Sequence, residues 1–144
     1  MAKASSIINK FGKMAGWNSI TVNMLGRDLE AINELDYNDT IDVEVVKGAG
    51  AYPIGYGEGN YEAKASISMY LEEWNALQRS LPPGMSIAEI APFPIVVEYE
   101  YDGLKIKDVF TAKLKGRGVA VKQGDKTIAY KSDLLVLGKI NWNI

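Results

Sequence analysis

Residues 40–71 read TIDVEVVKGAGAYPIGYGEGNYEAKASISMYL, and the two runs that flank the glycines decide the fold. In the first run, three β-branched residues alternate with two acids; in the second, residues 62–69, small or apolar residues alternate with polar ones. Successive side chains of a strand point to opposite faces, so this period of two predicts two half-buried β-strands. We expect them to be antiparallel neighbours, each with one apolar and one hydrophilic face.

The same alternation recurs on both sides of this stretch. We expect strands over residues 17–24, 94–102, 104–118 and parts of 119–143, separated by turn signals at 25–28, 103 and 123–126. Residues 29–39 fit either a short helix or a second hairpin strand. The motif DYNDT at 36–40 resembles a further turn, and we therefore favour the strand.

One principal helix is predicted over residues 72–81, EEWNALQRSL. Two acids open it and Arg79 lies in its last turn, as the helix dipole favours, while Trp74, Leu77 and Leu81 form an apolar stripe. With six to eight strands beside it, the chain is predicted to be mainly β. We expect an antiparallel β-sandwich or barrel with one flanking α-helix and a long glycine/tyrosine-rich loop. Residues 1–16 are assigned to an N-terminal arm and 17–144 to a single β domain.

Composition restricts the chemistry. The chain has 144 residues and a net charge of −2, with no cysteine and no histidine. Disulfides, thiolate metal sites and every mechanism based on histidine are therefore excluded, and no basic excess exists to hold nucleic acid. We predict no enzyme, no cofactor and no metal. No apolar run suits a signal peptide or a bilayer span, and we expect the protein to be made and kept in a cytoplasm.

The glycine-rich segment does not fit a nucleotide loop. A dinucleotide fingerprint needs G-x-G-x-x-G before a helix, but GAGAYP places Pro53 at the third glycine and a strand follows. Tyrosines interleave with the glycines, and tyrosine is enriched at protein interfaces. We favour a loop that orders against another protein molecule, with folding back over its own barrel as the alternative. The predicted contact residues are Lys47, Gly48, Gly50, Tyr52, Pro53, Ile54, Gly55, Tyr56, Gly57, Glu58, Gly59 and Asn60.

The hydrophilic strand faces allow two interpretations. An antiparallel sheet normally shows one face to solvent. Alternatively, the sheet continues between subunits into a large barrel whose polar side lines an aqueous lumen. The candidate lumen residues are Asp42, Glu44, Glu62, Lys64, Ser66 and Ser68.

Residues 42–77, DVEVVKGAGAYPIGYGEGNYEAKASISMYLEEWNAL, resemble the tail tube proteins of tailed bacteriophages and of prophage tail-like particles. The matching features are an acidic strand, the glycine/tyrosine segment, an alternating strand and a helix that opens with EEW. The resemblance implies that six copies close into a ring with a β-barrel lumen, and that rings stack into a tube conducting DNA. A lumen wall with more acid than base would let DNA slide without sticking.

The resemblance also implies partners and a location. The partners would be further copies of the chain, a tape-measure protein, tail initiator and terminator proteins, and a sheath protein in a contractile tail. DNA would pass without specific binding, no membrane would be involved, and assembly would occur in the host cytoplasm before the tube is part of the virion tail. The alternative from a different class is a β-sandwich module that binds a small ligand or carbohydrate.

Overall fold

The computed structural model describes residues 16–101 and 103–144, so the predicted N-terminal arm lies, apart from residue 16, outside the described residues. The chain is mainly β, as predicted, with one antiparallel sheet of seven strands in the order β2-β1-β5-β6-β7-β4-β3. The strands are β1 (Ile20–Met24), β2 (Arg27–Asp28), β3 (Ile32–Lys47), β4 (Pro53–Tyr70), β5 (Phe93–Tyr101), β6 (Leu104–Leu114) and β7 (Ala129–Asn141). The α-helix is α1 (Leu71–Arg79), and short 3-10 turns are η1 (Trp17–Ser19) and η2 (Ile87–Glu89).

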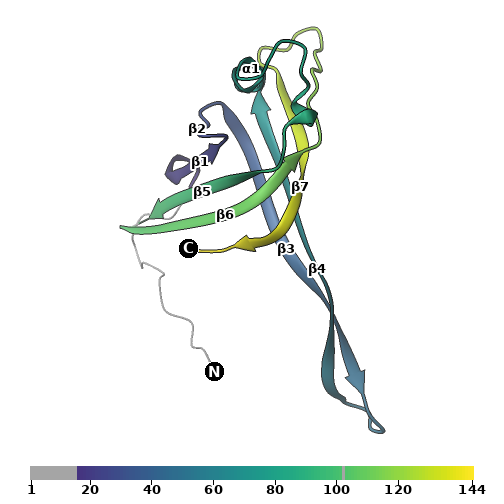
Figure 1. Ribbon diagram of the computed structural model, residues 1–144. Coiled ribbons are helices and arrows are strands. Elements are labelled where there is room, and N and C mark those ends of the chain that lie inside the picture. Colours follow the sequence, from purple (N-terminus) through teal and green to yellow (C-terminus); the bar gives the residue numbers. More distant parts are fainter. Residues whose placement is uncertain (1–15, 102) are drawn as a thin grey trace.

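The sheet is strongly curved but does not close. Figure 1 shows β5 and β6 running across the direction of β3 and β4. Strands β2 and β3 form the two edges of the sheet, so the expected antiparallel strands belong to one open sheet and not to a closed barrel. An open edge presents unpaired backbone groups that another chain can pair with.

The core fills the concave face of this sheet. Ile67 and Met69 of β4 are fully buried, as their alternation predicts, and they pack in one cluster with Trp74 and Leu77 of α1. The Trp74 indole donates a hydrogen bond of 3.2 Å to the carbonyl of Tyr130 in β7. The predicted helix is confirmed, and its apolar stripe closes one end of the core.

A buried acid links α1 to the first hairpin. Glu73 is 2% exposed and accepts hydrogen bonds from the Arg27 guanidinium (2.9 Å) and the Ala31 backbone N–H (3.1 Å). Burial alone would raise the pKa of the Glu73 carboxyl, but these donors outweigh it and hold the pKa below its usual value. The ionised carboxylate therefore fixes the start of the helix to the β2–β3 connection.

Two predictions, one turn and one strand segment, are wrong. The DYNDT motif lies inside β3, where Tyr37 faces the core and its polar neighbours Asp36 and Asn38 face outward. The run at 119–122 before the QGDK turn forms no strand. In the first case the strand alternation overrides the local turn propensity, because every residue of the motif pairs with β4, as do the residues before and after it.

The glycine-rich segment is also not a long loop. Its residues from Pro53 onward are the first half of β4 and pair with β3 up to Lys47, so only Gly48–Tyr52 connect the strands. The glycines do not prevent strand pairing, because the hydrogen bonds between the two strands join backbone groups and need no side chain. Figure 1 shows this end of the hairpin projecting well beyond the rest of the sheet. We call residues 41–60 the hairpin arm.

Candidate functional site

The hairpin arm is the exposed part of a ribbon whose lower part belongs to the core. Every residue from 41 to 60 is exposed, whereas residues 65–69 of the same strand β4 are buried. Strand β7 pairs with β4 only from Lys64 to Tyr70, so beyond that point β3 and β4 have no third strand. All twelve predicted contact residues of the glycine segment lie in the arm.

A β-bulge sets which side chains share a face of the arm. Ile41 pairs with Tyr61, but Val43 pairs with Glu58, so β4 holds one extra residue opposite Asp42. Between residues 61 and 69 the odd-numbered side chains of β4 face the core. Beyond the bulge the even-numbered side chains of β4 lie on that face instead. Tyr56, which pairs with Val45, therefore lies on the face that continues from the core.

That face carries mostly apolar side chains, with Glu58 opposite Val43, and none of the described residues covers it. Val43 is 58%, Val45 64% and Tyr56 70% exposed, and Tyr52 and Ile54 at the tip are more exposed still. Scattered single apolar residues on a surface are normal, but a contiguous apolar face marks an interaction site. The arm thus extends the core face of the sheet beyond the residues that cover it.

On the opposite face of the arm, β3 supplies the side chains and β4 supplies glycines. Gly55 pairs with Val46 and Gly57 with Glu44, so each β3 side chain there faces a residue without one. A Cβ added to Gly59 would lie 3.1 Å from the Cβ of Asp42, so this glycine makes room for the acid. The glycines therefore recur at every second position because they share one face of a paired strand, and not because the segment is a flexible loop.

The base of the arm is held by residues from the end of β7. Asp39 accepts hydrogen bonds from the Trp142 indole (3.0 Å) and the Tyr61 hydroxyl (2.8 Å), and these donors lower the pKa of the Asp39 carboxyl. The Tyr61 hydroxyl also accepts from the Ile140 backbone N–H at 3.1 Å. We call these hydrogen-bonded residues the clamp, because they join the end of the core to the start of the arm.

A second part of this clamp is built on Tyr37. Its ring stacks between Phe110 and Trp142, with 5.3 Å between ring centroids on each side. Its hydroxyl donates a 2.6 Å hydrogen bond to Asp108, which is 1% exposed and also accepts from the Asn143 backbone N–H. Burial, followed by the bond to Asp108, raises the pKa of Tyr37 far above its ordinary value. No local pattern in the sequence indicates this clamp, because its members are far apart in the chain.

The six candidate lumen residues share the convex face of the β3–β4 ribbon. Their positions alternate with the core-facing residues, and Asp42 and Glu44 continue this face onto the arm. Lys64 lies 3.5 Å from Glu62, and on the same face Lys131 of β7 lies 3.0 Å from Glu34. Ser66 and Ser68 are buried between larger neighbours, so only four of the six are open to solvent in the single chain.

Other kinds of site find little support in the described part of the chain. Among residues 16–101 and 103–144, no three acidic side chains come together as a metal site. No helix within those residues is long and apolar enough to cross a bilayer.

Comparison with known proteins gives a fold and no family. No family model and no curated protein sequence matches the chain. A chain in the cryo-EM structure of the anti-feeding prophage baseplate, six-fold symmetrised, is similar in structure with a TM-score of 0.51. The similarity covers 85% of this chain and 89% of that one, at 8% sequence identity. At this identity the two chains share a fold, and the similarity shows nothing further.

Proposed function

We propose that this protein is a structural subunit of a phage tail or of a phage-like particle, and more narrowly a tail tube subunit. The observation that carries the proposal is the largely apolar face of the hairpin arm, which continues the core face and which none of the described residues covers. Burying apolar area is the main favourable term in protein association, so an exposed ribbon with apolar side chains favours contact with another molecule. The fold shared with a chain of a six-fold symmetric baseplate supports an assembling subunit.

In this proposal six copies form a ring and rings stack into a tube. The convex face with Asp42, Glu44, Glu62 and Lys64 would line the lumen, and its acids would keep DNA from binding there. The open sheet edges β2 and β3 would pair between neighbours, which removes exposed edges without closing the sheet of any one chain. The tape-measure, initiator and terminator proteins would be the other partners, with a sheath in a contractile tail. The subunit would assemble in the host cytoplasm and end in the particle's tail.

Negative-stain electron microscopy of the purified protein, at low and high concentration and with added tail-initiation complexes, tests the proposal. Rings of six with a central hole, or stacked tubes, are expected. Single subunits under all these conditions would contradict it.

A pair of arm variants sharpens this test. Val45→Asp combined with Tyr56→Asp should abolish assembly, because it places two charges on the apolar face. The Tm should stay within a few degrees of the wild-type value, since both residues are exposed. Glu44→Gln is the matched control on the opposite face and should still assemble. Assembly by the double variant would refute the role of the apolar face.

A further inference from the structure

The connection between β6 and β7 is exposed and basic. Residues 115–128 carry four basic side chains and one acid, which gives a net charge of +3, and we call them the basic connection. The neighbouring connection, residues 80–92, adds only Glu89. Three of the basic side chains are exposed and form no ion pair with any described residue, and these are Lys115, Lys122 and Lys126. This segment therefore carries positive charge that the described residues do not balance.

The basic connection also exposes apolar side chains. It is fixed to α1 by Arg117, whose guanidinium donates a 3.2 Å hydrogen bond to the Trp74 carbonyl and lies over the Trp74 ring. Val119 and Val121 follow and are 58% and 60% exposed. Their alternation predicts a strand over residues 119–122, but no described strand pairs with them. Covering these valines would remove apolar area from water, which favours contact with another surface.

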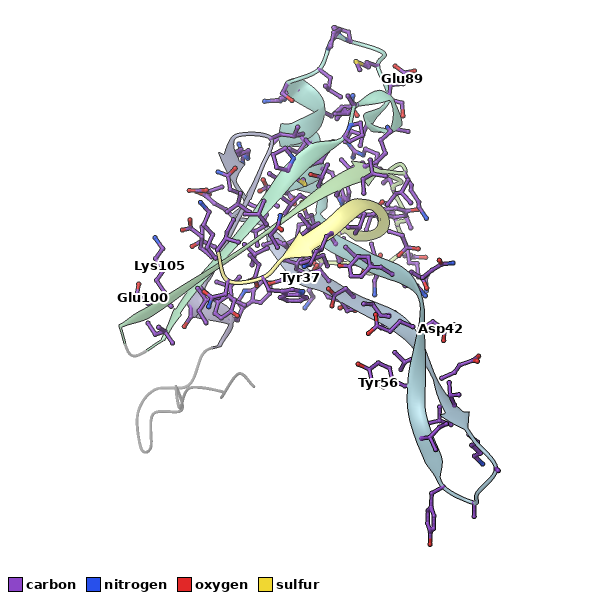
Figure 2. The ribbon with its side chains drawn as sticks, turned by 60° about the horizontal axis from the view of Figure 1, so that its bottom comes forward. Tyr37, Asp42, Tyr56, Glu89, Glu100 and Lys105 are labelled. Carbon is purple, nitrogen blue, oxygen red and sulfur yellow. The ribbon has the colours of Figure 1, made fainter. Side chains whose placement is uncertain are left out.

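The basic connection and the hairpin arm lie at opposite ends of the molecule. Figure 1 shows the β6–β7 connection beside α1 at one end and the arm projecting at the other. Figure 2 shows the same separation between Glu89, at the end that carries α1, and Tyr56 on the arm. Any contact between these two surfaces therefore joins two copies of the chain.

The arm carries the opposite charge to the basic connection. Residues 41–60 hold three acids and one lysine, which gives a net charge of −2. One of these acids, Glu58, lies opposite Val43 on the largely apolar face. Each surface thus combines exposed apolar side chains with charge of one sign, and the two signs are opposite. Opposite charges steer two surfaces together and fix their register more than they raise the affinity.

We infer that the largely apolar face of the arm docks on the basic connection of a second copy. Val45 then packs on Val121, and Glu58 lies beside Lys122. This inference rests on the proposed function and names the surface that the arm contacts. The contact is head-to-tail, because different surfaces at opposite ends of the chain meet, and such contacts stack copies along one direction.

Disulfide cross-linking tests the contact directly, because the wild-type chain has no cysteine. Val45→Cys and Val121→Cys are made in separate chains of different mass, mixed under assembly conditions and oxidised. A disulfide needs Cα atoms within about 7 Å, so it reports direct contact. A mixed disulfide of the two chains is expected in several-fold excess over the Val45→Cys homodimer. Glu100→Cys, exposed and away from both surfaces in Figure 2, replaces Val121→Cys in the control and should give no excess.

Charge reversal gives an independent readout in the same assemblies. Glu58→Lys and Lys122→Glu should each raise the protein concentration needed for assembly several-fold. The two together in one chain should lower it again, because every contact then regains an opposite pair, and such rescue supports the inference.

Two results would overturn the inference while leaving the proposed function in place. One is wild-type assembly with neither an excess of the mixed disulfide nor rescue. The other is binding of duplex DNA that Lys122→Glu abolishes while assembly is unchanged, since DNA phosphates would then be the partner of the basic connection. Absence of assembly in the wild type would overturn the proposed function itself.

Discussion

Tyr37→Phe should destabilise the protein through one lost hydrogen bond. The substitution keeps the ring that stacks on Phe110 and Trp142 and removes only the hydroxyl, which donates to the buried Asp108 at 2.6 Å. Hydrogen bonds to charged groups contribute about 1.5–3 kcal/mol. For a domain of this size, each kcal/mol changes the Tm by roughly 2–4 °C, so the Tm should fall by about 3–12 °C.

At alkaline pH the same variant should lose less stability than the wild type does. The pKa of Tyr37 is raised in the folded protein, so above its ordinary value of 10.0 the unfolded chain releases a proton that the folded chain holds. The stability that this residue contributes is therefore present below pH 10 and lost above it, by up to about 1.4 kcal/mol per pH unit. Tyr37→Phe removes this loss, so its stability deficit should shrink above pH 10.

Chemical denaturation with urea at pH 7, 9, 10.5 and 11, followed by tryptophan fluorescence, measures both effects. Tyr52→Phe is the control, because it removes a phenol that is 84% exposed at the tip of the arm. It should match the wild type at neutral pH. A Tyr37→Phe protein as stable as the wild type at pH 7, or with a deficit that does not change above pH 10, would refute the reasoning.

Two further substitutions test the fold. Glu73→Ala should lower the free energy of unfolding by about 2–3 kcal/mol, because it leaves Arg27 and the Ala31 N–H without their buried acceptor. This loss is smaller than for a fully buried ion pair, because the half-exposed Arg27 can bind water instead. Since the folded pKa of Glu73 is lowered, its contribution is present above about pH 4.5 and lost as the pH falls, so urea titrations of variant and wild type should converge in acid. Gly26→Ala should lower the free energy of unfolding by about 1–2 kcal/mol, because Gly26 has φ +76° in the β1–β2 turn. Gly50→Ala should leave it unchanged, because nothing lies within 4 Å of the added Cβ. Thermal denaturation measures both. A neutral Gly26→Ala or a costly Gly50→Ala would count against the backbone argument.

Much of the fold follows from local patterns in the sequence. Residues 62–69 and 94–101 alternate with the period of a strand and are strands, and EEWNALQR has the acids, the apolar stripe and the final Arg79 of a helix. Whether the strands form one sheet or two depends on curvature and on the pairing of distant strands. Composition and periodicity do not carry that information, so the sandwich or barrel expected from the sequence is a single open sheet in the structure.

The candidate site shows where sequence periodicity fails. Extended from residues 62–68, the alternation places Tyr56 on the polar face, but the extra residue opposite Asp42 returns it to the core face. The glycines that suggest a flexible loop are instead the short residues of a paired strand. The clamp on Asp39 and Tyr37 escaped prediction because Trp142 and Asp108 are 103 and 71 residues away from their partners.

Those long separations have a consequence for how the chain folds during synthesis. The β3–β4 hairpin is local, since Lys47 pairs with Pro53, and it can form early. The clamp at its base cannot form until residues 140–143 have left the ribosome, because Trp142 and Asn143 supply its donors. Contacts this distant in sequence slow the folding of small domains. A nascent chain therefore exposes the ribbon before the sheet beneath it is complete, and ordering of the last strand is the step that gives the chain a fixed shape.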